Sequence, residues 1–442
     1  MIALLTGMAL VSTACASTEG RPAAVTDFVE VRTGSEVVGA SRLHPGVTHT
    51  QFTADLDNQP EAVAAARGLL AARGLFQNQH IMGWGALNPE PSPGEYRWDS
   101  LDSRIDLIRQ TSGIPVITLC CAPDWMKGGP RGKTDWSKIN EAPAARHYTD
   151  FAELAGKVAR RYPDVRYYQV WHGLKGFYDP KLHRWNYEGY TRLYNLVYRE
   201  LKSVNAEIAV GGPVVTMDSW SEERLMTKPS ALGGPWGVLD QRALDAVAYW
   251  LEHKEGADFI TLDLSTANKD GASPSDAFDS LLKINDVSKW ISQRSELPLW
   301  AARWHPFPGS AQEWGAAEQS ALLASALVQM INSNVQVELL WQPQAKGPSC
   351  VGCLWTDTRA VGGGQPTEAY TSIDAVTAKF PPGTSIVRTT TSSPDVTALS
   401  SREVTLLVNE LPQPQEVSVD GTRTSLGPHE VRIVARRGPG GV

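Results

Sequence analysis

The chain has 442 residues, of which 42% are hydrophobic and 20% charged, and its formal net charge is −7. These proportions are those of a soluble globular protein, and they exclude a disordered chain and a polytopic membrane protein. Because an acidic surface gives nucleic acid no electrostatic footprint, no nucleic-acid partner is expected. The unusual count is 15 Trp, more than the 12 Tyr or the 9 Phe. Some of these rings belong in a core, and others are suited to stacking on sugars.

The N-terminal residues have the character of an export signal. Residues 1–11 are apolar, contain no Lys or Arg, and are followed by small residues, Cys15 and a polar stretch. A short apolar segment before a small-residue site is typical of a secretory signal and too short for a spanning helix. The position of Cys15 is similar to that of the lipid-bearing Cys of bacterial lipoproteins, although Ser12 stands where Leu is usual. We therefore expect residues 1–22 to be a leader and linker of an exported protein, on the cell surface or held to the membrane only through lipid on Cys15. The alternative is cleavage elsewhere, which discards Cys15.

The other cysteines form two close pairs. Cys120 and Cys121 lie in an apolar run, where buried Cys acts as a small hydrophobe. Cys350 and Cys353 form a single CxxC motif in a loop rich in Gly and Pro. A zinc site needs two further ligands at matching spacing, and none is near, so a disulfide is the better prediction in an exported protein. No metal and no other cofactor is expected.

Short apolar runs alternate with helical patterns along most of the chain. Strands are predicted at 47–53, 80–85, 115–121, 165–171, 207–212, 258–264, 297–304 and 335–341. Helices are predicted at 60–73, 99–110, 187–201, 240–253 and 311–332. Eight strands that alternate with helices predict an α/β fold, a (β/α)₈ TIM barrel over residues 45–380.

The sequence pattern changes on both sides of this predicted barrel. Residues 28–38, within an N-terminal segment at 23–44, alternate like a strand. After residue 380 the pattern predicts strands at 385–391, 403–409, 416–419 and 430–435, separated by Gly and Pro turns. We expect a small C-terminal β-sandwich over 381–437, which the N-terminal strands could complete.

In a TIM barrel, ligands bind at the carboxyl ends of the strands. Five Trp residues fall at the predicted strand ends, which favours a cleft that binds an oligo- or polysaccharide. The expected carbohydrate-binding residues are Trp84, Trp125, Trp171, His172, Lys175, Arg303, Trp304 and Trp341.

Several of the same stretches carry a family resemblance. They are WGALNPEPSPGEYRW at 84–98 with Leu101-Asp102, TLCCAPDW at 118–125, YQVW at 168–171 with LKGF at 174–177, and LPLW at 297–300. The chain resembles the retaining glycosidases of clan A, most closely family 39-like enzymes, over residues 45 to 380. The resemblance implies a Glu general acid/base in a Trp-Asn-Glu at the end of strand four, and a Glu nucleophile at the end of strand seven.

This chain departs from the family pattern at both positions. Trp171 is followed by His172 and Gly173 in place of Asn and Glu, and Arg303 stands at the nucleophile position. Glycine has no proton to donate, and a guanidinium remains protonated at any working pH. No catalytic residue is therefore expected, and the family's retaining hydrolysis is interpreted as lost.

Other groups near the predicted cleft could substitute for the missing pair. They are Asp124, Asp179, Asp263, His172 and His305, and each Asp is more readily interpreted as a structural hydrogen-bond partner. His172 could hold a sugar hydroxyl as a neutral imidazole. Glu338 is expected to pair with a basic neighbour.

Three interpretations of Arg303 remain open. It could pair with a nearby acid such as Asp263, bind an anionic sugar through its fork of donors, or be solvated at the rim. Three functions remain open as well. The first is a glycosidase-like protein that binds carbohydrate without hydrolysing it, the second is an active O-glycoside hydrolase with displaced catalytic residues, and the third is a cell-envelope scaffold for a protein partner.

Overall fold

The computed structural model describes residues 28–55, 57–274, 276–308, 314–347 and 350–436. The predicted leader, with Cys15, lies outside these residues. Within them, no helix is long and apolar enough to span a bilayer.

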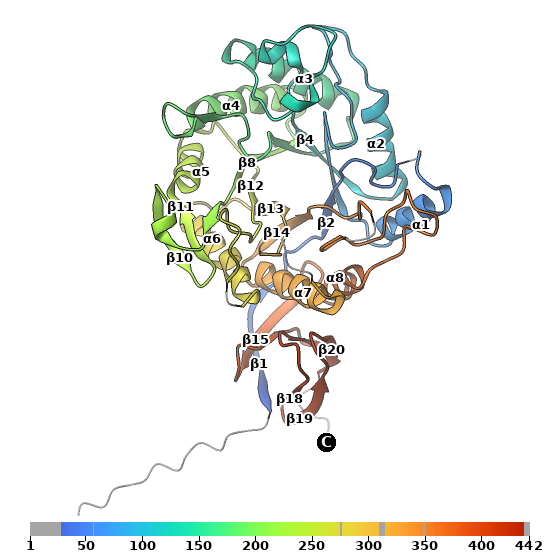
Figure 1. Cartoon of the computed structure of the whole chain (residues 1–442), viewed down its shortest axis with the longest axis vertical. Coiled ribbons are helices and arrows are strands. Elements are labelled where there is room, and N and C mark those ends of the chain that lie inside the picture. The colour runs from blue at the N-terminus through green and yellow to red at the C-terminus, as the bar shows by residue number, and fades with distance from the viewer. Residues whose placement is uncertain (1–27, 56, 275, 309–313, 348–349, 437–442) are drawn as a thin grey trace, which may run out of the picture.

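The described residues form the expected barrel of eight parallel strands (Figure 1). The strands, in order, are β2 (Gly46–Thr48), β3 (Phe76–His80), β4 (Ile114–Leu119), β5 (Tyr167–Val170), β8 (Ala209–Thr216), β12 (Phe259–Asp263), β13 (Leu299–Trp304) and β14 (Val335–Leu340). The barrel closes where Leu340 of β14 pairs with Val47 of β2. Its interior is filled by apolar rings, with Phe259 stacked on Trp300 at 3.9 Å between ring centroids.

A helix follows each barrel strand and packs on the outside. These helices are α1 (Pro60–Ala71), α2 (Asp99–Gln110), α3 (Tyr148–Arg161), α4 (Tyr187–Val204), α5 (Gln241–His253), α6 (Leu282–Ser292), α7 (Ala316–Asn332) and α8 (Glu368–Lys379). The helical pattern did not reveal α3, α6 or α8. Two small sheets lie in the loops after β5 and β8. The first pairs β6 (Tyr178–Asp179) with β7 (Arg184–Trp185). The second consists of β9 (Ser219–Trp220), β10 (Pro229–Gly234) and β11 (Gly237–Asp240).

The second strand lies earlier than the sequence predicted. We expected residues 80–85, and β3 ends at His80. The apolar-run signal failed because Gln77, Asn78 and Gln79 are polar yet fully buried. Neighbouring side chains satisfy these amides: His49 Nε2 donates to Gln77 Oε1 at 2.9 Å, and Arg104 donates to Gln79 at 3.0 Å. Buried polar groups are tolerated when they are hydrogen-bonded.

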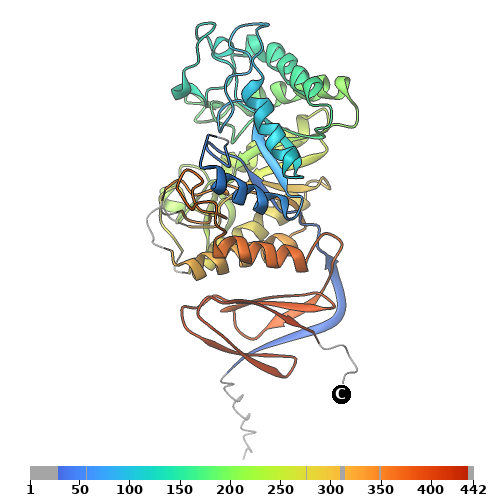
Figure 2. The ribbon, with the colours of Figure 1, turned by 90° about the vertical axis from the view of Figure 1, so that its right-hand side faces the viewer.

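The C-terminal strands form one sheet with the N-terminal strand. In the described part of the chain its order is β19-β18-β1-β15-β16-β17-β20. The strands are β1 (Val29–Ala40), β15 (Ser385–Thr391), β16 (Val396–Ser400), β17 (Val404–Asn409), β18 (Gln415–Val419), β19 (Thr422–Leu426) and β20 (Val431–Ala435). Residues from both ends of this order share a small core, so the sheet curls into two facing layers (Figure 2). Strands β16 and β19 were not predicted.

The sheet packs against α7 of the barrel, and this joint contains a buried acid. The hydroxyl of Ser325 on α7 donates to Glu410 Oε1 at 3.0 Å. Burial raises the pKa of Glu410 to about 7, and the nearby Asp276 and Asp395 act in the same direction.

The raised pKa predicts a pH-dependent strength of this joint. Folding favours the protonated form, so the contribution of Glu410 is complete below its ordinary pKa of 4.5 and is lost as the pH rises through about 7. We expect Glu410→Gln to raise the free energy of unfolding at pH 8 by about 1–3 kcal/mol and to change it little at pH 4. Urea unfolding at the two pH values measures the change in the free energy of unfolding. Glu416→Gln, at an exposed position on β18, is the control. An equal effect at both pH values would contradict the assignment.

Candidate functional site

Four residues from neighbouring barrel strands come together at the carboxyl end of the barrel. Three of them, Gly173, Asp263 and Arg303, were named from the sequence, and Thr216 was not. Gly173 follows β5, Thr216 ends β8, Asp263 ends β12 and Arg303 lies near the end of β13. A Cβ atom on Gly173 would lie 3.2 Å from Thr216 Oγ1, which donates to Asp263 Oδ2 at 3.4 Å. Arg303 Nη1 donates to the same Oδ2 at 2.7 Å. The four residues therefore form one continuous row across the mouth.

Arg303 pairs with Asp263, the first of its three predicted interpretations. The Asp263 side chain is 2% exposed and the Arg303 side chain 27%. Asp263 Oδ1 accepts from the backbone N–H of Ser265 at 3.0 Å and from its hydroxyl at 2.6 Å. The guanidinium carbon of Arg303 also lies 4.7 Å from the ring centroid of Trp341. Both oxygens of Asp263 thus accept hydrogen bonds. Asp263 holds one edge of the Arg303 guanidinium, and the Trp341 ring contacts one face of it.

The backbone at Gly173 disfavours any side chain. Its φ is +63°, in the left-handed region that costs other residues about 1–2 kcal/mol. The stem of Lys175 lies in van der Waals contact with the same space, with Cγ 3.7 Å and Cε 3.8 Å from the position that a Cβ on Gly173 would take. A carboxyl side chain at this position would meet both backbone strain and Lys175.

Four aromatic rings fill the centre of the mouth. Trp84 lies 4.4 Å from His80 and 5.1 Å from His172 between ring centroids. His172 stacks at 5.7 Å on Trp341, which lies 6.1 Å from Trp84. Trp84, His172 and Trp341 were predicted site residues. His80 was not, because the predicted strand began at that residue and hid its place at a strand end.

The two imidazoles are buried beside positive charge. His80 Nε2 and His172 Nδ1 are 3.4 Å apart. Burial lowers the pKa of His172 well below its usual range, and Lys175 and Arg303 lower it further. Burial, His172, Lys175 and Arg303 do the same to the pKa of His80. Both rings are therefore neutral at physiological pH and can donate or accept hydrogen bonds.

A polar pocket of about 370 Å³ opens beside this aromatic cluster. Its walls include Thr216, Asp263, Arg303, His305 and Trp341 from the ends of β8, β12, β13 and β14. The wall also includes Asp218, Ser265, Lys269 and Val351.

Asp218 is a pocket residue that the sequence did not single out. Lys269 Nζ lies 3.6 Å from its Oδ2. Burial raises the pKa of Asp218 despite the opposing charges of Lys269 and Lys283. The residue lies just beyond the predicted strand at 207–212, which ends four residues before β8 does. A correct strand end was the only signal that could have found it.

Trp171 and Trp304 are corrections to the predicted site. Both are fully buried, so neither offers a ring face to a ligand. Trp171 packs between Phe151 and Phe177, and its indole N–H donates to the carbonyl of Lys175 at 2.8 Å. Trp304 packs in the layer between barrel and helices and donates to Glu338 Oε2 at 2.6 Å. A strand end alone does not decide whether a ring points into the mouth or behind it.

Trp125 is half-buried and lies elsewhere on the loop after β4. Its indole N–H donates to the carbonyl of Glu90 at 2.9 Å, and its ring meets His147 edge-on. Among the described residues it is not part of the pocket wall.

The remaining acids have structural partners. Asp124 is buried, lies 3.5 Å from Lys127 and accepts from the backbone N–H of Asp135. Asp179 accepts from the backbone N–H groups of Lys181 and Leu182.

Glu338 is a further correction. We expected it to pair with a basic residue, but its described partners are the indole of Trp304 and the backbone N–H of Gly46. Burial raises its pKa to about 7. The acid can be accommodated there without a cation because two donors face it.

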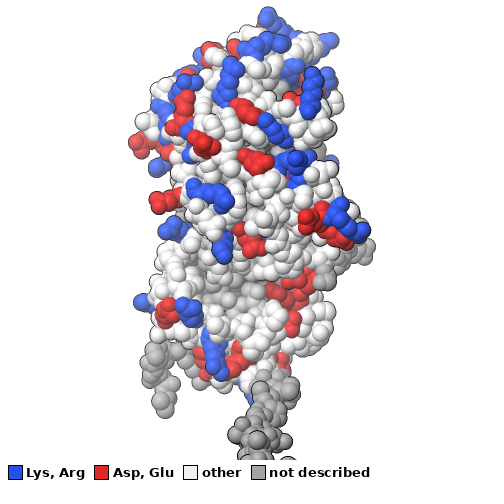
Figure 3. Space-filling model, turned by 90° about the vertical axis from the view of Figure 1, so that its left-hand side faces the viewer, with Lys and Arg blue, Asp and Glu red and all other residues white. Residues whose placement is uncertain are grey.

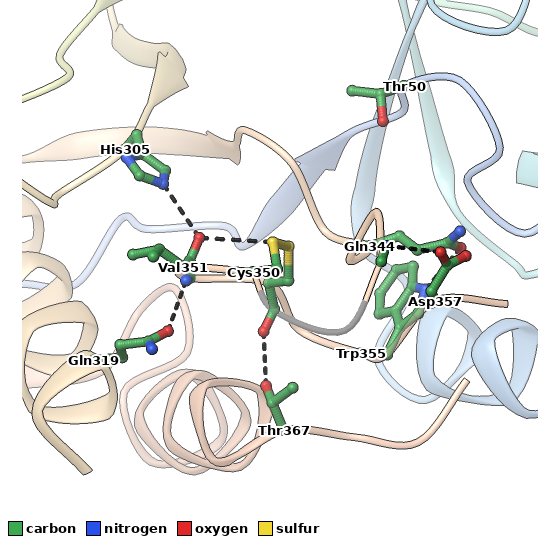
Figure 4. The surroundings of a disulfide bond; sticks show 12 residues. Thr50, His305, Gln319, Gln344, Cys350, Val351, Trp355, Asp357 and Thr367 are labelled. Carbon is green, nitrogen blue, oxygen red and sulfur yellow. Dashed lines mark hydrogen bonds between the residues drawn. A yellow bond between two sulfur atoms is a disulfide. The ribbon is translucent and has the colours of Figure 1, made fainter. Parts of the chain in front are cut away.

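Both cysteine pairs are disulfides. Cys350 and Cys353 are joined in the loop after β14, which forms one wall of the pocket (Figure 4). Between them, the carbonyl of Val351 lies 3.3 Å from His305 Nε2, and Gly352 N–H donates to Gln319 at 2.8 Å. Cys120 and Cys121 were expected to be unlinked buried thiols. They are buried, but they are bonded to each other.

Comparison with protein-family models identifies the family of this chain. The model of glycosyl hydrolases family 39 matches residues 90–340, more than half of the chain. The chain belongs to glycosyl hydrolase family 39. A β-xylosidase of Caldicellulosiruptor saccharolyticus is 29% identical over 136 residues, which span 28% of this family 39 chain and 26% of that protein.

Solved structures share the fold of this family 39 member. A monomeric β-xylosidase from Caulobacter crescentus CB15 is 13% identical with a TM-score of 0.56, covering 88% of this chain and 83% of that one. SrfJ from Salmonella typhimurium is 11% identical with a TM-score of 0.62, covering 94% of each chain. At such low identity the likeness concerns the fold alone.

The ion pair in the mouth predicts a stability effect. Arg303→Met leaves the Asp263 carboxylate buried without its cation, so we expect a loss of about 2–4 kcal/mol in the free energy of unfolding. Adding Asp263→Asn removes the stranded charge and should recover part of that loss. Urea unfolding of both variants tests the pair. Arg224→Met, which breaks the exposed Arg224–Glu222 pair, is the control and should change the free energy of unfolding little. Additive losses from the two mouth substitutions would contradict the coupling.

Proposed function

We propose that this family 39 protein binds carbohydrate at the pocket and does not carry out the family's retaining hydrolysis. The observation that carries the proposal is the row from Gly173 to Arg303 across the mouth. Retaining hydrolysis requires two carboxyl groups about 5 Å apart, one as acid/base and one as nucleophile. Here the two corresponding positions, Gly173 after strand four and Arg303 near the end of strand seven, carry no carboxyl group.

The surrounding contacts support the same conclusion. Arg303 cannot act as a nucleophile, and its charge opposes an oxocarbenium-like transition state. Asp263 is adjacent to Arg303, but four donors occupy its two oxygens. A carboxylate engaged in this way is a poor nucleophile.

Carbohydrate is the ligand class that family membership and pocket chemistry favour. The pocket falls in the usual volume range of small-molecule sites, and its hydroxyl, carboxylate, guanidinium and imidazole groups can both donate and accept hydrogen bonds. Figure 3 shows one face of the molecule, on which basic and acidic side chains are mixed. The sequence relative described as a β-xylosidase lends support at the level of sugar recognition.

The proposal predicts binding without turnover. A glycan array on the purified protein identifies a ligand, and titration calorimetry measures its affinity. We expect Trp341→Ala to weaken binding about tenfold or more because it removes a pocket wall, and Trp125→Ala to leave it unchanged. Wild type should release no aryl alcohol from aryl pentosides or hexosides. Loss of binding in Trp125→Ala alone would place the site on the other loop.

A second candidate is hydrolysis through displaced groups, and Asp218 favours it. This carboxyl lines the pocket and has a raised pKa, as a general acid requires. Turnover in the aryl-glycoside assay that Asp218→Asn abolishes would establish this function in place of the first.

Export and lipid anchoring belong to the same proposal. They rest on residues 1–22, where Cys15 follows an apolar stretch and small residues. Cys15→Ser should move the protein from the membrane fraction to the soluble fraction, since a chain without acyl groups has little membrane affinity. Unchanged membrane retention would rule out an anchor at Cys15.

A further inference from the structure

Arg303 has hydrogen-bonding capacity that the protein does not use. Its guanidinium carries five N–H bonds, and the described residues provide an acceptor only for Nη1. Asp263 cannot take more, because Thr216 and Ser265 occupy the rest of its oxygens. Just over a quarter of the side chain remains exposed, at the wall of the pocket. Donors of this kind match an anionic oxygen acceptor.

Two lysines add positive charge around the same space. Lys269 lines the pocket and is half exposed. Lys175 is exposed, and its stem passes beside Gly173, next to the pocket residue Thr216. Partial burial and the charge of Arg303 lower the pKa of Lys175, so the two cations interact.

The acids of the pocket oppose this charge only weakly. Asp263 is already compensated by Arg303 at 2.7 Å. Asp218 is the other acid; Lys269 lies 3.6 Å from it, and burial raises its pKa. Three cations therefore face two acids, which leaves an excess of positive charge around the pocket.

We propose that the pocket recognises a saccharide with an anionic substituent, a carboxylate or a sulfate ester, through Arg303 with Lys175 and Lys269 beside it. The inference rests on the proposed function, because it requires that the pocket binds sugar. It assigns the position near the end of strand seven to binding the charged substituent. The selectivity comes from charge, so it is sensitive to salt.

Matched ligands test the charge directly. Calorimetry compares an oligogalacturonide with its methyl ester, and a sulfated oligosaccharide with its desulfated form, at low and high salt. We expect the charged member of at least one pair to bind about tenfold more tightly at low salt, with the difference reduced at high salt. The pair that shows the difference identifies the substituent as carboxylate or sulfate.

Charge variants locate the effect. Lys175→Gln and Lys269→Gln should each weaken only the charged ligand, by several-fold, and Asp218→Asn should strengthen it. Lys379→Gln on α8, beside the C-terminal sheet, removes the same charge far from the mouth and should change nothing.

The binding results distinguish recognition of an anionic substituent from carbohydrate binding as such. Equal affinity for the charged and neutral members, with binding lost in Trp341→Ala, would overturn the anionic substituent and leave carbohydrate binding intact. Absence of binding by every ligand on the array would overturn both. Weakening of charged and neutral ligands alike in the lysine variants would also overturn the inference.

Discussion

The ion pair between Arg303 and Asp263 is the contact on which the barrel mouth depends. A carboxylate that is 2% exposed needs compensation, and it receives a cation at 2.7 Å together with three hydroxyl or amide donors. Those contacts fix the guanidinium over Trp341, and Trp341 in turn stacks on His172. Trp341 therefore connects the ion pair to the rest of the aromatic cluster, with the pocket beside them.

The same charge determines the chemistry available in the mouth. Burial, reinforced by Arg303 and Lys175, keeps His80 and His172 neutral, so the centre of the mouth has two weakly basic rings. A glycosidase active site needs the opposite arrangement, with carboxyl groups that offer a proton and stabilise positive charge on the sugar. The sugar-facing end of this barrel is therefore organised around positive charge, while its scaffold remains that of the family.

The sequence predicted the barrel because most of its strands contain an apolar run and are followed by a helix or loop of usual length. It failed at β3, where buried amides and His80 replace apolar residues. It placed Gly173 and Arg303 at strand ends, since these follow recognisable runs. It could not separate Trp84 and Trp341 from Trp171 and Trp304, because all four sit at strand ends. For Trp304, the face that the ring takes depends on irregular register near the ends of β12 and β13, and no local pattern encodes it.

The long strand β1 has a mechanical consequence. It begins at Val29, is flanked by β18 and β15, and leads from the curled sheet directly into the barrel. A pulling force applied at the start of β1 acts along the strand, so it shears the hydrogen bonds to both neighbours together. Such a geometry resists load far better than bonds that open one after another. Tension on the N-terminal side would be borne first by this sheet.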